Sequence, residues 1–84
     1  MTRIVYFAWV REQVGVPEET VDLPDKVATA ADLASWLAAR GGGYASAFAD
    51  PSKLRCALDQ MAAPLSAPLG SATEIAFFPP VTGG

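Results

Sequence analysis

The stretch IVYFAWV, residues 4–10, is hydrophobic at both odd and even positions. Its aromatic and β-branched residues are typical of a β-strand. A strand with one face in water would alternate between polar and apolar residues, and this stretch does not. We therefore expect both of its faces to be covered, as in a central strand or in a strand whose outer face meets a partner.

The segments that follow this strand predict a turn, a second strand and one helix. Gly15 and Pro17 indicate a turn between residues 11 and 19. TVDL, residues 20–23, is then expected to pair back as a hairpin strand.

Residues 29–40 carry the strongest helix signal in the chain. Thr29 and Asp32 have the spacing of a capping box at the start of a helix. Arg40 is expected in the last turn, and residues 41–43, which are all glycine, should end the helix. The side chains expected to face the core are Leu33, Trp36 and Leu37.

The second half of the chain predicts a further helical turn and two further strands. Residues 53–59 alternate, so Cys56 falls on the same side as Leu54 and Leu58 and is interpreted as a small buried hydrophobic residue. Pro79 and Pro80 should end the last strand because neither can donate a backbone hydrogen bond. The expected elements are a helical turn over residues 44–50, a strand over 53–59, a loop over 63–70 and a last strand over 73–78.

The expected order is strand, strand, helix, strand, short strand and strand, which is the order of a ubiquitin-like β-grasp fold. This is an α+β fold in which one main helix packs on one face of a mixed sheet. The connection rules allow the first and last strands to lie side by side in the middle of the sheet. We predict a β-grasp domain over residues 1–78 and a flexible C-terminal tail over residues 79–84.

Composition excludes several classes of function. The chain has 84 residues, of which 51% are hydrophobic and 18% charged, which is typical of one small globular domain. A net charge of -3 without clustered basic residues argues against a nucleic-acid partner. With no histidine and one cysteine, we expect no metal site, no intrachain disulfide and a cytoplasmic location. Residues 4–10 are too few to cross a membrane.

The last six residues, PPVTGG, predict an extended tail. The two prolines favour an exit that stands off the domain, and six residues reach about 20 Å. Gly83 and Gly84 have no side chain and can pass through a narrow channel, at whose end the Gly84 carboxylate would be presented. A carboxylate becomes a good electrophile once it is adenylated, so the tail implies a partner that uses ATP.

Three segments carry a resemblance to a known family: IVYFAWVREQVG at residues 4–15, LDQ at 58–60 and EIAFFPPVTGG at 74–84. Over nearly its whole length the chain resembles the small sulfur-carrier subunits of molybdopterin synthase. Asp59 is a departure, because many of these relatives have asparagine at the corresponding position.

The resemblance implies a cycle of activation and sulfur delivery. An adenylyltransferase related to ubiquitin-activating enzymes would attach AMP to the Gly84 carboxylate, and a sulfur-donating protein would convert it to a thiocarboxylate. The tail would then supply dithiolene sulfur to precursor Z, the cyclic pyranopterin monophosphate, in the large catalytic subunit of the synthase. In this cycle the chain is a co-substrate without catalytic residues or a bound cofactor of its own, in a heterotetramer of two small and two large subunits.

Site residues follow from the tail and from the resemblance. Gly84 is the predicted chemical site, and the residues predicted to thread into the partner are Pro80, Val81, Thr82 and Gly83. The resemblance also implies that the sheet face away from the helix docks the partners, with Phe77 turned into the core. The residues predicted for that interface are Phe7, Phe78, Met61, Ala62 and Arg11.

Three other functions remain open at this stage. A sulfur carrier for thiamine thiazole synthesis would also end in two glycines, although such chains are typically shorter and lack Phe-Phe-Pro-Pro. A ubiquitin-like modifier would form isopeptide bonds from Gly84 to lysines of target proteins. A pure interaction module would keep its partner function after Gly83 and Gly84 are removed.

Overall fold

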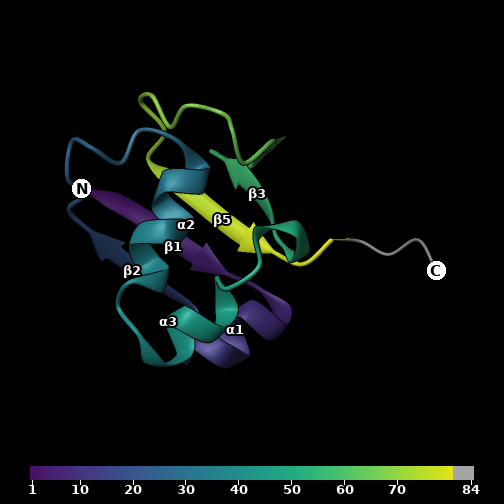
Figure 1. Ribbon diagram of the computed structural model, residues 1–84. Coiled ribbons are helices and arrows are strands. Elements are labelled where there is room, and N and C mark those ends of the chain that lie inside the picture. The colour runs from purple at the N-terminus through teal and green to yellow at the C-terminus, as the bar shows by residue number, and fades with distance from the viewer. Residues whose placement is uncertain (81–84) are drawn as a thin grey trace.

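A five-stranded sheet forms the centre of the computed structural model, which describes residues 1–80 (Figure 1). Helix α2 lies over the sheet, and α1 and α3 pack against each other beside it. The elements are β1 (Thr2–Tyr6), α1 (Ala8–Val14), β2 (Glu18–Val21), α2 (Ala30–Ala38), α3 (Gly42–Ala47), a 3-10 turn (Pro51–Lys53), β3 (Arg55–Leu58), β4 (Met61–Ala63) and β5 (Glu74–Phe78).

The strand order in the sheet is β2-β1-β5-β3-β4. β1 runs parallel to β5, and the other neighbouring pairs are antiparallel. Ile4 lies opposite Ile75 in the parallel pair, and Tyr6 lies opposite Phe77. The predicted β-grasp arrangement, with the first and last strands adjacent in the middle of the sheet, is confirmed.

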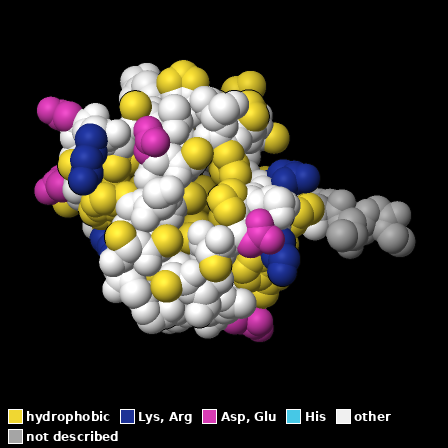
Figure 2. Space-filling view, viewed as in Figure 1, with side chains coloured by type: hydrophobic (Ala, Val, Ile, Leu, Met, Phe, Trp, Pro, Cys, Tyr) yellow, Lys and Arg dark blue, Asp and Glu magenta, His cyan; other side chains and the backbone are white. Residues whose placement is uncertain are grey.

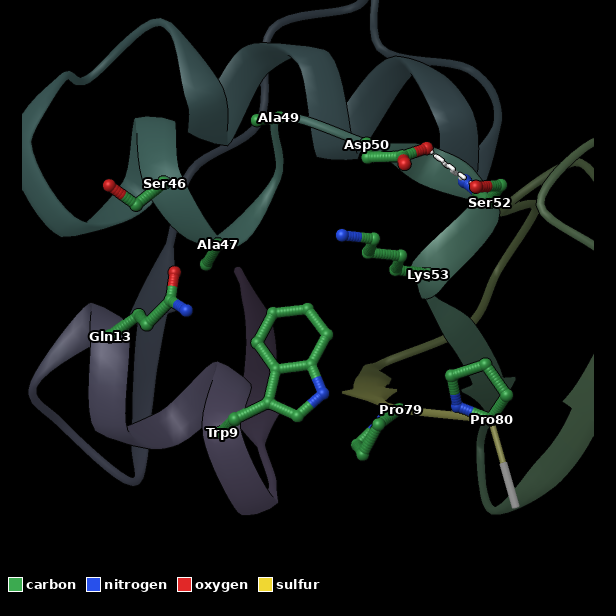
Figure 3. A pocket seen from close by; sticks show the side chains of 10 residues that line it. All are labelled: Trp9, Gln13, Ser46, Ala47, Ala49, Asp50, Ser52, Lys53, Pro79 and Pro80. Atoms are coloured by element: carbon green, nitrogen blue, oxygen red, sulfur yellow. Dashed lines mark hydrogen bonds between the residues drawn. The ribbon is translucent and has the colours of Figure 1, made fainter. Parts of the chain in front are cut away.

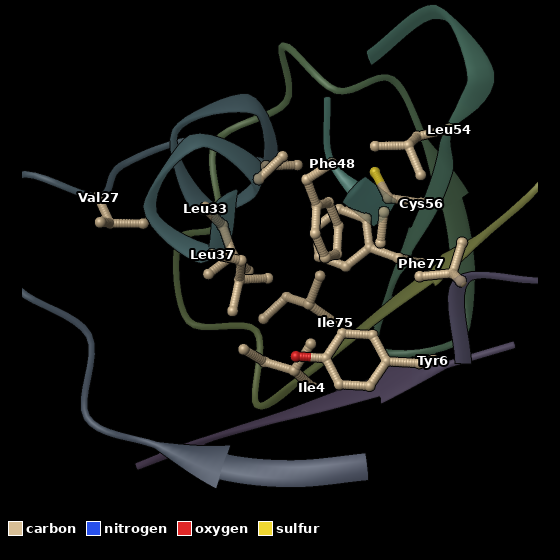
Figure 4. Close-up of a cluster of buried hydrophobic side chains, with 14 of the residues drawn as sticks. Ile4, Tyr6, Val27, Leu33, Leu37, Phe48, Leu54, Cys56, Ile75 and Phe77 are labelled. Carbon is tan, nitrogen blue, oxygen red and sulfur yellow. The ribbon is translucent and has the colours of Figure 1, made fainter. Parts of the chain in front are cut away.

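The core lies between the sheet and α2 (Figure 4). Phe77 is fully buried, and Phe48 meets its ring edge-on with 5.0 Å between the ring centroids. Such an aromatic pair contributes about 0.5–1.5 kcal/mol beyond the area that it buries. Cys56 is also buried, which raises the pKa of its thiol, so its predicted role as a small hydrophobic residue is confirmed.

The start of α2 is a capping box, as predicted. The Thr29 hydroxyl accepts the backbone N–H of Asp32, and the Asp32 carboxylate accepts the backbone N–H of Thr29, both at 3.1 Å. The prediction for the end of the helix is wrong. α2 ends at Ala38, so Arg40 lies beyond its last turn, where the Arg40 guanidinium donates to the Glu19 carboxylate at 2.8 Å.

The predicted strand over residues 4–10 is wrong in its second half. β1 ends at Tyr6, and Ala8, with a φ of 52°, turns the chain into α1. α1 occupies part of the turn predicted for residues 11–19, and Gly15 ends it with a φ of 96°. Val10 is therefore buried as a residue of a helix rather than as a residue of a strand. Val10 and Val14 have helical spacing, and the residues between them favour helix.

The contact between α1 and α3 depends on a glycine. A Cβ on Gly43 would lie 1.8 Å from the carbonyl oxygen of Gln13 at the end of α1. α3 begins at Gly42, two residues before the helical turn predicted for residues 44–50. One of the three glycines that were expected to end α2 therefore lets α3 approach α1 instead.

Candidate functional site

One face of the sheet carries the side chains that point away from the core. Strand register places Val5 opposite Ala76, Ala76 opposite Ala57, and Ala57 opposite Ala62. Since residues opposite each other in a sheet share a face, these four side chains form a row across β1, β5, β3 and β4. The row consists of small apolar side chains, so a partner surface can approach the sheet closely there.

Two phenylalanines extend this row toward the end of β5. Phe7 is 50% exposed and donates its backbone N–H to the carbonyl of Phe77 at 3.1 Å. Phe7 therefore lies where β1 and β5 finish, next to Phe78, which is half-buried and opposite Arg55. We call the six apolar residues of this face the open-face patch: Val5, Phe7, Ala57, Ala62, Ala76 and Phe78. Ala76, in the middle of the row, is itself only 6% exposed.

The structure brings only some of the predicted interface residues together. Ala62 belongs to the open-face patch, but Met61, which is 74% exposed, pairs with Leu58 at the other end of β3 and alternates to the opposite side of the sheet. Arg11 is exposed on α1, one helical turn after Phe7, to whose carbonyl its backbone N–H is bonded at 3.3 Å. Arg11 can therefore reach a partner that covers Phe7.

The opposite end of the sheet face is charged. The Arg3 guanidinium donates to the Glu74 carboxylate on the neighbouring strand. Asp59 has a φ of 48° in the turn between β3 and β4, and its carboxylate accepts the backbone N–H groups of Glu74 and Thr73, each at 3.0 Å. These bonds lower the pKa of Asp59. Asp59 thus fastens the start of β5 to this turn, a task that the side-chain oxygen of asparagine can also perform.

The chain leaves the sheet at the aromatic end of the open-face patch. β5 ends at Phe78, where we predicted the boundary between domain and tail, and Pro79 and Pro80 are half-buried. Figure 2, which views the helical side, shows Lys and Arg side chains beside this exit. The other residues of the predicted tail site, Val81, Thr82, Gly83 and Gly84, lie outside the described residues.

A cleft beside the point where the chain leaves β5 was not predicted from the sequence. Trp9, Lys53, Pro79 and Pro80 line a cleft of about 730 Å³ on the helical side of β5 (Figure 3). The sequence gives little signal for it, because Trp9 was interpreted as part of the first strand.

Residues 1–80 contain no group of three or more Cys, Asp or Glu side chains placed to hold a metal ion. None of the described helices is long and apolar enough to cross a membrane.

Comparisons with known proteins find relatives along the whole chain. The model of the ThiS family matches residues 4–84. A molybdopterin synthase sulfur carrier subunit of Haemophilus influenzae is 40% identical over 84 residues, and one of Escherichia coli is 40% identical over 86 residues. Each alignment covers 100% of both proteins.

Solved structures with the same fold also match. SAMP1 from Haloferax volcanii superposes with a TM-score of 0.69 and 26% identity, covering 99% of this chain and 98% of its own. A Pyrococcus furiosus protein, provisionally named molybdopterin converting factor subunit 1, gives a TM-score of 0.72 and 25% identity, covering 95% and 97%.

Proposed function

The chain belongs to the ThiS family and, within it, to the molybdopterin synthase sulfur carrier subunits, and from this premise we propose that it carries sulfur on its C-terminal glycine for molybdopterin synthesis. The observation that carries the proposal is the 40% identity over the full length, since the matched region includes the PPVTGG end. The geometry supports it, because β5 delivers the chain to the edge of an apolar sheet face that a partner can cover.

The chemistry begins with activation of the tail. The Gly84 carboxylate attacks the α-phosphorus of ATP in a partner adenylyltransferase, and pyrophosphate leaves. A hydrosulfide equivalent from a sulfur-donating protein then attacks the acyl carbon and expels AMP, giving a thiocarboxylate. No oxidant is needed in this form of the reaction, because the sulfur arrives already reduced.

Sulfur delivery takes place in the large catalytic subunit. The thiocarboxylate sulfur attacks a carbon of the pterin precursor and displaces an oxygen leaving group from it, which gives a thioester. Water then cleaves the bond between the acyl carbon and sulfur, so that the Gly84 carboxylate is restored and the sulfur stays on the pterin. A dithiolene contains two sulfur atoms, so the carrier must leave, be recharged and return. A heterotetramer with one small subunit on each of two large subunits would suit this cycle.

The open-face patch would hold the carrier while its tail reacts. Phe7 and Phe78 lie at the exit of the tail, so a partner that covers them is positioned to receive Gly84. A large aromatic side chain at the centre of an interface commonly contributes more than 1 kcal/mol to binding. The same patch would serve the activating enzyme and the large subunit in turn, since both need access to the tail.

The test is the intact mass of the C-terminal peptide after incubation with the adenylyltransferase, ATP and a sulfur source. We expect replacement of one oxygen by sulfur at Gly84 and no change in a variant that lacks Gly84. Gly83→Ala is the finer probe, because its side chain should slow sulfur transfer while leaving thermal unfolding unchanged. An unmodified carboxylate with an adenylyltransferase that is active on another carrier would contradict the proposal.

The same reaction separates the alternative functions. Adding the large synthase subunit and the pterin precursor should yield molybdopterin, whereas a thiazole carrier would be sulfurated but would not support this step. Isopeptide-linked products on lysines of other proteins would indicate a modifier.

A further inference from the structure

The cleft beside the tail exit is built from three parts of the chain. Trp9 comes from α1, Lys53 from the 3-10 turn, and Pro79 and Pro80 from the segment that follows β5. In Figure 3 the indole of Trp9 and the ammonium group of Lys53 face the hollow from opposite sides. Most of its surface is apolar, because the side chains that line it include Trp9, Ala47, Ala49, Pro79 and Pro80.

The polar side chains of the cleft include both donors and acceptors: Trp9, Gln13, Ser46, Asp50, Ser52 and Lys53. Within residues 1–80, Lys53 forms no salt bridge and the Trp9 indole donates no hydrogen bond. Asp50 lies on the same rim, where its Oδ1 accepts the Ser52 hydroxyl at 2.6 Å and the Ser52 backbone N–H at 3.0 Å. The Ser52 hydrogen bonds, and to a smaller extent the nearby charge of Lys53, lower the pKa of Asp50. The cleft therefore presents an apolar floor and one lysine ammonium that lies near Asp50 but forms no salt bridge within residues 1–80.

A protein that takes up the tail has to close around its exit. Phe78 belongs to the open-face patch, whereas Pro79 and Pro80 line the cleft, so the end of β5 separates the two surfaces. A partner that encloses the residues after Pro80 has atoms on both faces of the sheet at the end of β5. The partner that covers Phe78 therefore also covers the mouth of the cleft.

Covering the cleft imposes a chemical requirement on that partner. A lysine ammonium that loses water without gaining an acceptor costs several kcal/mol, and an indole N–H without a partner costs about 1–3 kcal/mol. A carboxylate offers acceptors to both groups and matches the single charge of Lys53. Asp50 offsets part of the Lys53 charge and the chain carries a net charge of -3, so a polyanion such as a triphosphate or a nucleic acid would be repelled more strongly than a single carboxylate.

We propose that this cleft is a second docking surface, in which the large synthase subunit places an aspartate or glutamate side chain against Lys53 and Trp9. The inference rests on the proposed function, since it assumes that this subunit receives the tail. The open-face patch supplies apolar contact on one side of β5, and the cleft supplies a charged contact on the other. Together they would fix the direction in which the tail enters.

The first test compares two charge reversals. Lys53→Glu and Lys26→Glu change the net charge equally, but Lys26 is exposed in the loop before α2, away from the tail. We expect Lys53→Glu to weaken binding to the large subunit by about tenfold or more, because a desolvated charge pair is lost, and Lys26→Glu to change it by about twofold or less. Binding is measured by calorimetry, and both variants are checked for an unchanged thermal unfolding midpoint.

The second test identifies the partner group directly. A carbodiimide forms an amide between a lysine and a carboxylate in contact, with loss of one water, so it should join Lys53 to an acidic residue of the large subunit. In addition, Trp36→Phe leaves Trp9 as the one tryptophan of the chain, and its emission should change on binding.

The outcomes separate this inference from the proposed function. Equal affinities for the two charge reversals, together with no cross-link at Lys53, would overturn the cleft as a docking surface while leaving the sulfur carrier intact. A wild-type chain that neither binds the large subunit nor accepts sulfur would overturn the proposed function, and the cleft inference with it.

Discussion

Phe77 and Phe78 are neighbours in β5 and occupy opposite faces of the sheet. Phe77 is fully buried against Phe48, whereas Phe78 is half-buried in the open-face patch beside the tail exit. The covered face consists of large side chains under α2, and the open face is dominated by small apolar side chains with two phenylalanines at one end. The difference indicates that the covered face stabilises the fold and that the open face is available to a partner.

The largest effect is expected on the covered face. Phe77→Ala should lower the free energy of unfolding by about 3–5 kcal/mol, because it removes a buried ring and leaves a cavity. Chemical denaturation measures the change. A loss below about 1 kcal/mol would mean that the covered face is not the source of stability.

A smaller loss is expected where two helices meet. Gly43→Ala should destabilise the fold by about 1–3 kcal/mol, because the new methyl group would overlap the carbonyl of Gln13 unless α1 and α3 separate. Gly70→Ala is a useful control, since the space around Gly70 is open and only its φ of 54° opposes the change. If Gly43→Ala costs no more than the control, the close approach of the helices is not limiting.

On the open face we expect affinity to change rather than stability. Phe78→Ala should weaken binding to the large synthase subunit by about tenfold, while the free energy of unfolding falls by about 1 kcal/mol or less. Val16→Ala, a truncation of an exposed residue in the turn after α1, is the matched control and should leave binding unchanged. Calorimetric binding and thermal unfolding of the same samples separate the two effects. A stability loss as large as that of Phe77→Ala would erase the distinction between the faces.

The smallest effect concerns an acidic side chain at the edge of the covered face. Burial acts to raise the pKa of Glu19, but hydrogen bonds from Tyr44, Arg40 and Tyr6 outweigh it and hold the pKa below its ordinary value of 4.5. Because the pKa of Glu19 is lower in the folded protein, its contribution to folding stability is present above pH 4.5. That contribution is lost as the pH falls through the pKa that Glu19 has in the folded protein. The unfolding midpoint of the wild type should therefore fall more steeply below pH 4.5 than that of Glu19→Gln. If the unfolding midpoints of the two proteins change in parallel with pH, the ionisation of Glu19 is not coupled to folding.

The fold could be predicted where local and tertiary preferences agree. The capping box at Thr29 depends on two neighbouring side chains, and the strand before Pro79 ends because proline cannot extend a sheet. Residues 8–10 were mispredicted because their aromatic and β-branched side chains favour a strand, while the chain turns at Ala8 and buries Val10 as a residue of α1. The helical spacing of Val10 and Val14, followed by Gly15, was the available signal.

The candidate site was predictable in part for the same reason. Alternation in β5 places Phe77 inward and Phe78 outward, so one of the two could be assigned to each face from the sequence. Met61 was harder to place, because its side depends on the register of the β3–β4 turn, where Asp59 and Gln60 both have positive φ. The cleft at Trp9 could not be predicted, since it forms between segments that are distant in the sequence.

The most direct test of the difference between the two faces is an NMR titration of the isotope-labelled chain with the large synthase subunit. We predict that the backbone amides of Val5, Phe7, Ala76 and Phe78 change most and that those of α2 change least. Changes concentrated on α2, with the open-face patch unaffected, would contradict the account.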